Sequence, residues 1–207
     1  MSASIIEFKH AYPSTSIQFT QNAAVGDVIV VNPSGGGAAA FSASDNLGNV
    51  YTVQTTGANI TCLTAPVTVA GVPKITVAGS GQSDIGVSGW IVRGLSSATA
   101  NKAGYASGLG NPLTVSLSPT VECALFVGWN NEGADVWTSF TESCVITPNG
   151  NHDTGHYDAN GYNLSLAAGT HAPGMNGTSN SGNRIAAVFL PITVGNRRRR
   201  LLIAGVA

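Results

Sequence analysis

Charged residues are scarce in this sequence. Only 9% of its 207 residues are Asp, Glu, Lys or Arg, whereas an ordinary soluble domain carries about 25%. Four of the nine basic residues stand side by side at 197–200, so residues 1–196 hold five basic residues against all ten acidic ones. A surface with so little charge repels its own copies weakly, which suits close packing in a shell or a fibre.

Cysteine pairs, membrane spans and signal peptides are also missing. Cys62, Cys123 and Cys144 are odd in number and far apart, and we interpret them as small buried hydrophobic residues. No stretch approaches the roughly 18 uninterrupted apolar residues of a membrane span. The first ten residues lack the basic region and apolar run of a secretory signal. We therefore expect a protein made in a cytoplasm, without a membrane segment.

Helical periodicity is absent too, and strand signals take its place. No apolar stripe with a period of 3.6 residues persists for three turns, and 26 glycines and nine prolines indicate many turns. The run 26–31 reads as a buried strand, and 50–55 alternates apolar and polar residues after the turn at 45–49. Further strands are predicted at 5–10, 16–20, 60–65, 72–78, 84–93, 112–118, 121–129, 143–147, 162–167 and 184–194.

About ten to twelve strands at this spacing predict an all-β fold of two packed antiparallel sheets, a jelly-roll-like β-sandwich. Residues 94–111 are small and polar and are expected to form a long loop over the sandwich. Residues 130–161 and 168–183 are rich in Asn, Gly, His and Asp and are expected to be loops at one end. No internal repeat is evident. The sequence thus predicts one sandwich domain over 1–196 and a C-terminal arm over 197–207.

Residues 151–158 form the richest polar cluster, with His152 and His156 four residues apart and two aspartates beside them. On a helix this spacing could hold a metal ion. Glycines at 150, 155 and 161 argue against a helix, so we favour a solvated or subunit-contact loop and predict no metal or cofactor. The chain also lacks a G-x-S-x-G elbow, and its four histidines suggest no triad. We therefore expect no enzymatic activity.

Aromatic residues in or beside the long loops indicate an alternative function. Flat rings can stack on sugar faces, while Asn and Asp bind hydroxyl groups, so the chain could be a carbohydrate-binding module or adhesin that contacts a host surface glycan. In the competing interpretation Trp129 ends a core strand and the other rings plug the end of the sandwich, as amphipathic rings often do. The candidate glycan contacts are Trp129, Trp137, Tyr157 and Tyr162.

The C-terminal arm combines a basic run with an apolar one. Arginine side chains bind phosphates and carboxylates bidentately, but nucleic-acid-binding arms are usually longer and polar throughout. The apolar run 201–207 suits docking into another subunit, and exposed to water it would promote aggregation. We favour docking between subunits over pairing with the chain's own sheet edge or binding to nucleic acid. The predicted docking residues are Arg197, Arg198, Arg199, Arg200, Leu201, Leu202 and Ile203.

Four segments in order carry a resemblance. They are a Gly-Asp-led hydrophobic strand at 26–31, an Asp-x-x-Gly-Asn-x-Tyr hairpin at 45–51, an Ala-Gly-led strand at 70–77 and a Trp-hydrophobic-x-Gly strand at 87–95. This order resembles β-sandwich virion proteins of tailed bacteriophages and prophages, of the head-decoration, fibre or tail type. Residues 186–190 resemble the final core strand of that class, so the resemblance covers most of 17–192.

The resemblance implies a β-sandwich and brings no shared catalytic residues. It also implies a structural protein located in a virion, as a capsid decoration, head fibre or tail component. Its expected partners are further copies of itself and other virion proteins. The arm lies outside the pattern and is interpreted from its chemistry alone.

Overall fold

The structure is a computed structural model that describes residues 2–36, 40–79, 83–108, 112–131, 137–147, 151–152, 156–177 and 183–193. Every regular element in these ranges is a β-strand, and every strand pairing is antiparallel. The predicted all-β, antiparallel sandwich fold is confirmed. Over the same ranges, no helix is long and apolar enough to cross a membrane.

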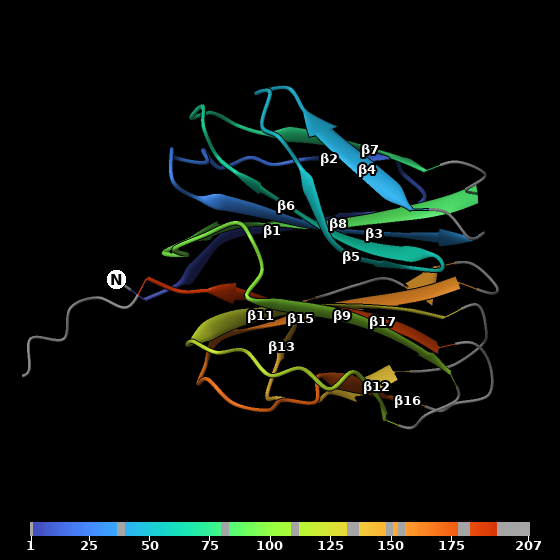
Figure 1. Cartoon of the computed structure of the whole chain (residues 1–207). Coiled ribbons are helices and arrows are strands. Elements are labelled where there is room, and N and C mark those ends of the chain that lie inside the picture. The colour runs from blue at the N-terminus through green and yellow to red at the C-terminus, as the bar shows by residue number, and fades with distance from the viewer. Residues whose placement is uncertain are drawn as a thin grey trace, which may run out of the picture.

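The strands of the described ranges form four sheets, stacked as four layers in Figure 1. The larger N-terminal sheet has the order β1 (Ser4–Ala11), β8 (Ser83–Arg93), β3 (Val28–Gly36), β6 (Ile60–Pro66), β5 (Thr52–Gly57). The smaller one has the order β2 (Ser16–Gln18), β7 (Lys74–Gly79), β4 (Phe41–Asp45). The two sheets form an N-terminal half, residues 2–93.

Residues 95–193 form a C-terminal half, also with two sheets. Its larger sheet has the order β13 (Val145–Thr147), β15 (His156–Leu166), β11 (Cys123–Asn131), β17 (Asn183–Pro191), β9 (Lys102–Gly108), and β14 (Asn151–His152) pairs with β15. Its smaller sheet has the order β10 (Leu113–Thr114), β16 (Gly174–Gly177), β12 (Trp137–Phe140).

The two halves repeat one topology. If β9 is matched to β1 and the strands are followed in chain order, with β14 as an extra strand, both sheets of the second half reproduce the strand orders of the first. The large sheets pack against each other, with β3 beside β11 and β5 beside β9. The structure thus contains two sandwiches packed through their larger sheets, where the sequence predicts two sheets and shows no repeat.

Packing explains why the repeat is invisible in the sequence. In the first half Val30 pairs with Trp90, and at the equivalent place in the second half Phe126 pairs with Val188. Each pair joins one large and one small side chain. The large one is on β8 in the first half, whereas in the second half it is on β11, the equivalent of β3. The rings of Trp90 and Phe126 meet across the junction with centroids 5.4 Å apart. The fold therefore constrains the combined volume of each pair and leaves the residue type at each position free to differ between the halves.

The central strands of the two large sheets are buried on both faces. Val28 and Val30 of β3 point into a core shared by the halves, while Ile29 and Val31 point into the core of the N-terminal half alone. The C-terminal half has a core of its own around Leu125 and Phe189. A strand with both faces covered reads as a continuous apolar run instead of an alternating one. The buried strand predicted at 26–31 overlaps β3 over 28–31.

Several strands lie where loops were expected. Residues 94–111 contain β9, whose small and polar residues form an edge strand that pairs with β17. The predicted loop 130–161 contains β12, β14 and half of β15, and 168–183 contains β16, whereas β13 lies within the strand predicted at 143–147. These strands are short, or carry polar side chains toward a polar interior, so they lack the apolar alternation by which strands are identified.

Candidate functional site

The structure places one of the four candidate glycan contacts in the interior. Trp129 is only 2% exposed and packs in the core of the C-terminal half, so its ring offers no free face to a sugar. Tyr162 is partly buried against the shared core, with its ring centroid 6.5 Å from that of Phe126. The side chains of Trp137 and Tyr157, like the whole arm 197–207, lie outside the described residues.

A buried polar network crosses the junction between the halves. We call it the polar seam, and its members are His10, Asn32, Ser34, Ser88, Asp158 and Asn160. Ser34 Oγ donates to Asp158 Oδ2 at 3.2 Å, and Asn160 Nδ2 donates to Ser88 Oγ at 2.8 Å. Both bonds join the larger sheet of one half to that of the other. The seam therefore fixes how the halves pair.

Two glycines make room for the seam. A Cβ atom on Gly86 would lie 2.8 Å from Asp158 Oδ2, and one on Gly128 would lie 2.9 Å from Asn32 Nδ2. Real Cβ atoms essentially never come within 3.0 Å of such neighbours. Glycine at both positions thus lets the polar side chains approach the facing sheet.

The seam brings together the residue types of a catalytic triad. His10 Nδ1 lies 2.9 Å from Ser88 Oγ, and His10 Nε2 lies 4.0 Å from Asp158 Oδ1. A nucleophilic serine must also be reachable by substrate, and Ser88 is 0% exposed and already bonded to Asn160. These contacts serve the packing of the two halves. Spacing along the chain could not reveal them, since the three residues come from β1, β8 and β15.

The predicted polar cluster at 151–158 is described only at its end. Asp158 is 3% exposed and belongs to the seam, whereas the side chains of His152 and His156 lie outside the described residues. In the described part of the chain, no three His, Cys, Asp or Glu side chains lie close enough to hold a metal ion.

All three cysteines are free, and two of them are buried. Burial, together with the negative charge of Glu122, raises the pKa of the Cys123 thiol to about 11, and burial together with the charge of Glu142 raises that of the Cys144 thiol to about 12. Thiols with such pKa values stay protonated at neutral pH and are poor nucleophiles. The interpretation of Cys62 and Cys123 as buried hydrophobic residues is confirmed.

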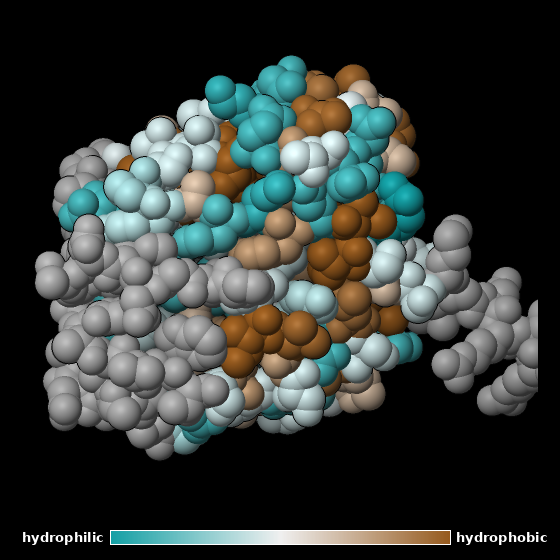
Figure 2. Space-filling model, turned by 180° about the vertical axis from the view of Figure 1, so that it is seen from behind, coloured by the Kyte–Doolittle hydropathy of each residue, from teal (hydrophilic) through white to brown (hydrophobic). Residues whose placement is uncertain are grey.

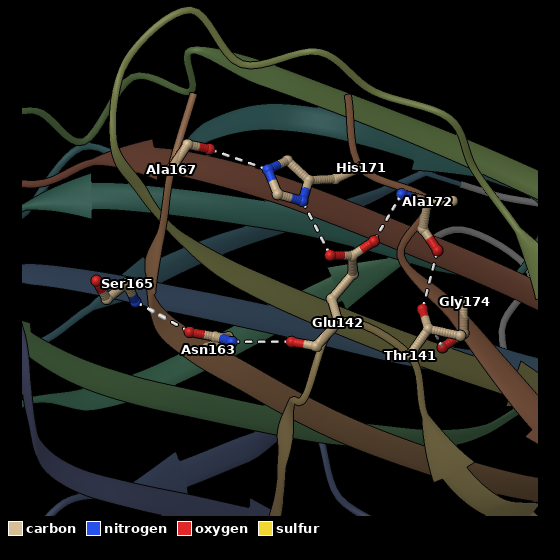
Figure 3. Close-up of polar contacts among 8 residues, drawn as sticks. All are labelled: Thr141, Glu142, Asn163, Ser165, Ala167, His171, Ala172 and Gly174. Atoms are coloured by element: carbon tan, nitrogen blue, oxygen red, sulfur yellow. Dashed lines mark hydrogen bonds and ion pairs between the residues drawn. The ribbon is translucent and has the colours of Figure 1, made fainter. Parts of the chain in front are cut away.

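A second polar cluster ties a turn to a connection in the C-terminal half (Figure 3). His171 Nδ1 lies 2.9 Å from Glu142 Oε2, and His171 Nε2 lies 2.9 Å from the carbonyl oxygen of Ala167. The backbone N–H of Ala172 donates to Glu142 Oε1 at 2.8 Å, and Asn163 Nδ2 donates to the Glu142 carbonyl oxygen at 2.8 Å. We call Glu142, Asn163 and His171 the acid–histidine tie.

The N-terminal half has a counterpart of this tie at the same place in its topology. Its β4–β5 turn is fixed by Asp45, which accepts hydrogen bonds from the backbone N–H groups of Leu47 and Asn49. Asn49 Oδ1 in turn accepts from the backbone N–H of Thr68, in the connection between β6 and β7. Because Asp45 and Asn49 join the equivalent turn and connection there without a histidine, we assign the acid–histidine tie a structural role.

Both described ends of the chain lie together, at the left of Figure 1. The backbone N–H of Thr193 donates to the Gly94 carbonyl oxygen at 2.8 Å, and Ile192 forms a β-bridge with Leu95. Gly94 has a φ of +86°, and a Cβ there would lie 2.7 Å from the Ser2 carbonyl oxygen. The N-terminus, the chain exit at Thr193 and the connection between the halves thus share one end, the exit end.

A groove opens beside this connection. One wall is formed by residues 97–99 and the other by the β5 and β6 edge, and its volume is about 400 Å³. We call it the linker groove. Val50, Pro66 and Ala98 give it apolar surface, and none of the described residues that line it is charged. Val50 is 74% exposed, the most exposed large apolar side chain in the described residues.

The opposite end of the molecule gathers the strand ends that flank several undescribed segments. The strands that border 37–39, 80–82, 132–136 and 178–182 all have these ends at the right of Figure 1. The molecule therefore has two distinct ends, one with the termini and one with these strand ends. The prediction that 130–161 and 168–183 are loops at one end is wrong, because both ranges contain strands and the connections between those strands lie at both ends of the molecule.

The face seen in Figure 2 carries apolar surface at its middle, where the two halves meet, and on the lower half. At the rim of the shared core, partly buried apolar side chains come from β1 and β15, among them Ile5, Phe8 and Leu164.

Comparison with protein-family models, with curated proteins and with solved structures found no match for this chain.

Proposed function

We propose that this protein is a non-enzymatic structural component of a bacteriophage virion. It would attach through its C-terminal arm, as a capsid decoration, head fibre or tail protein. The observation that carries the proposal is the placement of the chain ends. The described chain leaves the body at Thr193, at the exit end, opposite the strand ends that border the long connections. One end can therefore be anchored while the other faces outward.

The packing of the body supports this role. The halves share a core, and the seam adds hydrogen bonds between them, so the body is suited to rigid positioning. The described clefts are open surface grooves, and the serine–histidine–aspartate contact lies beneath the surface. Rigid, charge-poor sandwiches can be packed side by side with little mutual repulsion.

The arm supplies the attachment in this proposal. Its seven apolar residues, 201–207, need cover from water. A standard protein interface buries roughly 1,200–2,000 Å² in total. At about 25 cal/mol per Å² of apolar area, even the share of seven residues contributes usefully to attachment.

Deletion of residues 197–207 tests the proposal. We expect the truncated protein to keep the far-ultraviolet circular dichroism and the unfolding midpoint of the full chain, since the described body ends at Thr193. We expect it to be lost from particles purified from infected cells. Incorporation at the level of the full chain would contradict the proposed attachment.

A further inference from the structure

We propose that the linker groove receives the apolar segment Leu201–Ala207 of a second copy of this chain. This inference rests on the proposed function, in which the arm attaches the protein to a neighbour. It adds the acceptor surface and states which part of the arm enters it.

The groove has the chemistry of an acceptor for an uncharged segment. Its apolar surface comes from Val50, Pro66 and Ala98. Two of its polar side chains are already paired: Gln54 Nε2 donates to Thr64 Oγ1 at 2.8 Å, and Gln54 Oε1 accepts from the backbone N–H of Ala100 at 2.9 Å. An apolar occupant therefore leaves these groups paired, whereas arginine side chains would find no carboxylate among the described lining residues.

The groove also borders an open sheet edge. β5 is the last strand of its sheet, and its sequence contains none of the lysines, prolines or charges that commonly protect an edge. At Gly57 one face of β5 is covered, because the ring of Tyr105 stands where a Cβ atom would be. The part that begins near Val50 borders the groove, so an incoming extended segment can pair there as an added strand.

The chain exit lies close to the groove. Thr193 is bonded to Gly94, and the same connection continues within three residues into the groove wall at 97–99. The spacer 194–200 spans up to about 23–25 Å when extended, and its four adjacent arginines repel one another and favour extension. A spacer of this length is long enough to carry the apolar segment to the groove of a neighbouring copy.

If two copies exchange their arms, the apolar segment of each arm is covered by the groove of the other copy. If two exit ends face each other across a twofold axis, each arm reaches the groove of the other copy and the interface closes. The arginines then lie between the bodies, outside the uncharged grooves.

Substitution of Val50 tests the acceptor surface. Val50→Glu places a carboxylate in the groove, which must lose its hydration when the apolar segment binds. The side chain is exposed, so the fold is expected to tolerate the change. We expect self-association of the full chain, measured by sedimentation velocity, to weaken by at least about tenfold. Val25→Glu is the matched control, because Val25 is 67% exposed and lies outside the groove; association should persist in it.

Disulfide trapping decides between a neighbour's arm and the chain's own. Val50→Cys protein mixed with Leu202→Cys protein should give a covalent dimer on a non-reducing gel, and Val25→Cys in place of Val50→Cys should not. A disulfide formed only within the doubly substituted chain would overturn the proposal.

If deletion of 197–207 abolishes association while Val50→Glu and trapping have no effect, the groove is wrong and the proposed function stands. If the deletion leaves both association and incorporation unchanged, both fail.

Discussion

Single buried polar residues hold the two halves in register. Ser88 shows this most clearly, since it contacts His10 in its own half and Asn160 in the other while fully buried. A buried polar group that loses its partner costs about 1–3 kcal/mol, so sliding one half against the other would be penalised at each such contact. Composition shows that the chain is rich in Ser and Asn, but only the fold shows which of them meet.

The stability of the fold depends on pH through His171. The hydrogen bond to the Ala167 carbonyl, followed by the bond to Glu142, raises the pKa of His171 above its usual 6.5. The folded state therefore binds this proton more tightly than the unfolded state. The stability from this proton is fully present below pH 6.5 and is lost as pH rises through the folded pKa.

We therefore expect His171→Gln to lower the free energy of unfolding more at about pH 5.5 than at about pH 8.5, as measured by urea denaturation. His10→Gln is the comparison variant, since it alters the seam and leaves the acid–histidine tie intact. A loss for His171→Gln that is equal at both pH values would contradict the charged role of this residue.

At the scale of elements, burial explains which strands the sequence reveals. The runs at 26–31 and 121–129 are recognisable because the first part of β3 and most of β11 are covered on both faces by apolar cores and carry mainly apolar side chains. β9 and the first half of β15 are hidden, because one is a small-residue edge and the other turns Asp158 and Asn160 into the seam. The grouping of His10 with Asp158 depends on how the two large sheets pack against each other, for which a single sequence carries no signal.

Hydrogen exchange tests the difference in protection between buried central strands and edge strands. β11 lies between β15 and β17 and is buried along its whole length, whereas β5 is an edge strand with exposed residues. Amides of β11 should exchange only through global unfolding, and amides of β5 through local opening with smaller protection. Because the halves share a core, β3 should match β11. Exchange of one whole half well before the other would contradict a shared core.

At the scale of the whole molecule, a repeated sandwich yields a body with two different ends. The halves meet through their large sheets with matching strand orders, and the chain both begins and leaves at the exit end. The sequence predicts the sandwich class and the unusual arm, because composition and local pattern carry both. It hides the duplication, because complementary volumes at the junction, such as Trp90 with Val30 and Phe126 with Val188, can be exchanged between strands.

Sedimentation velocity of the purified full chain over a wide range of concentrations is the most direct measurement of the central claim, that this protein assembles through its C-terminal arm. The account predicts association that grows with concentration and disappears when residues 197–207 are deleted. A full chain that sediments as a monomer throughout, and shows no difference from the truncated chain, would contradict it.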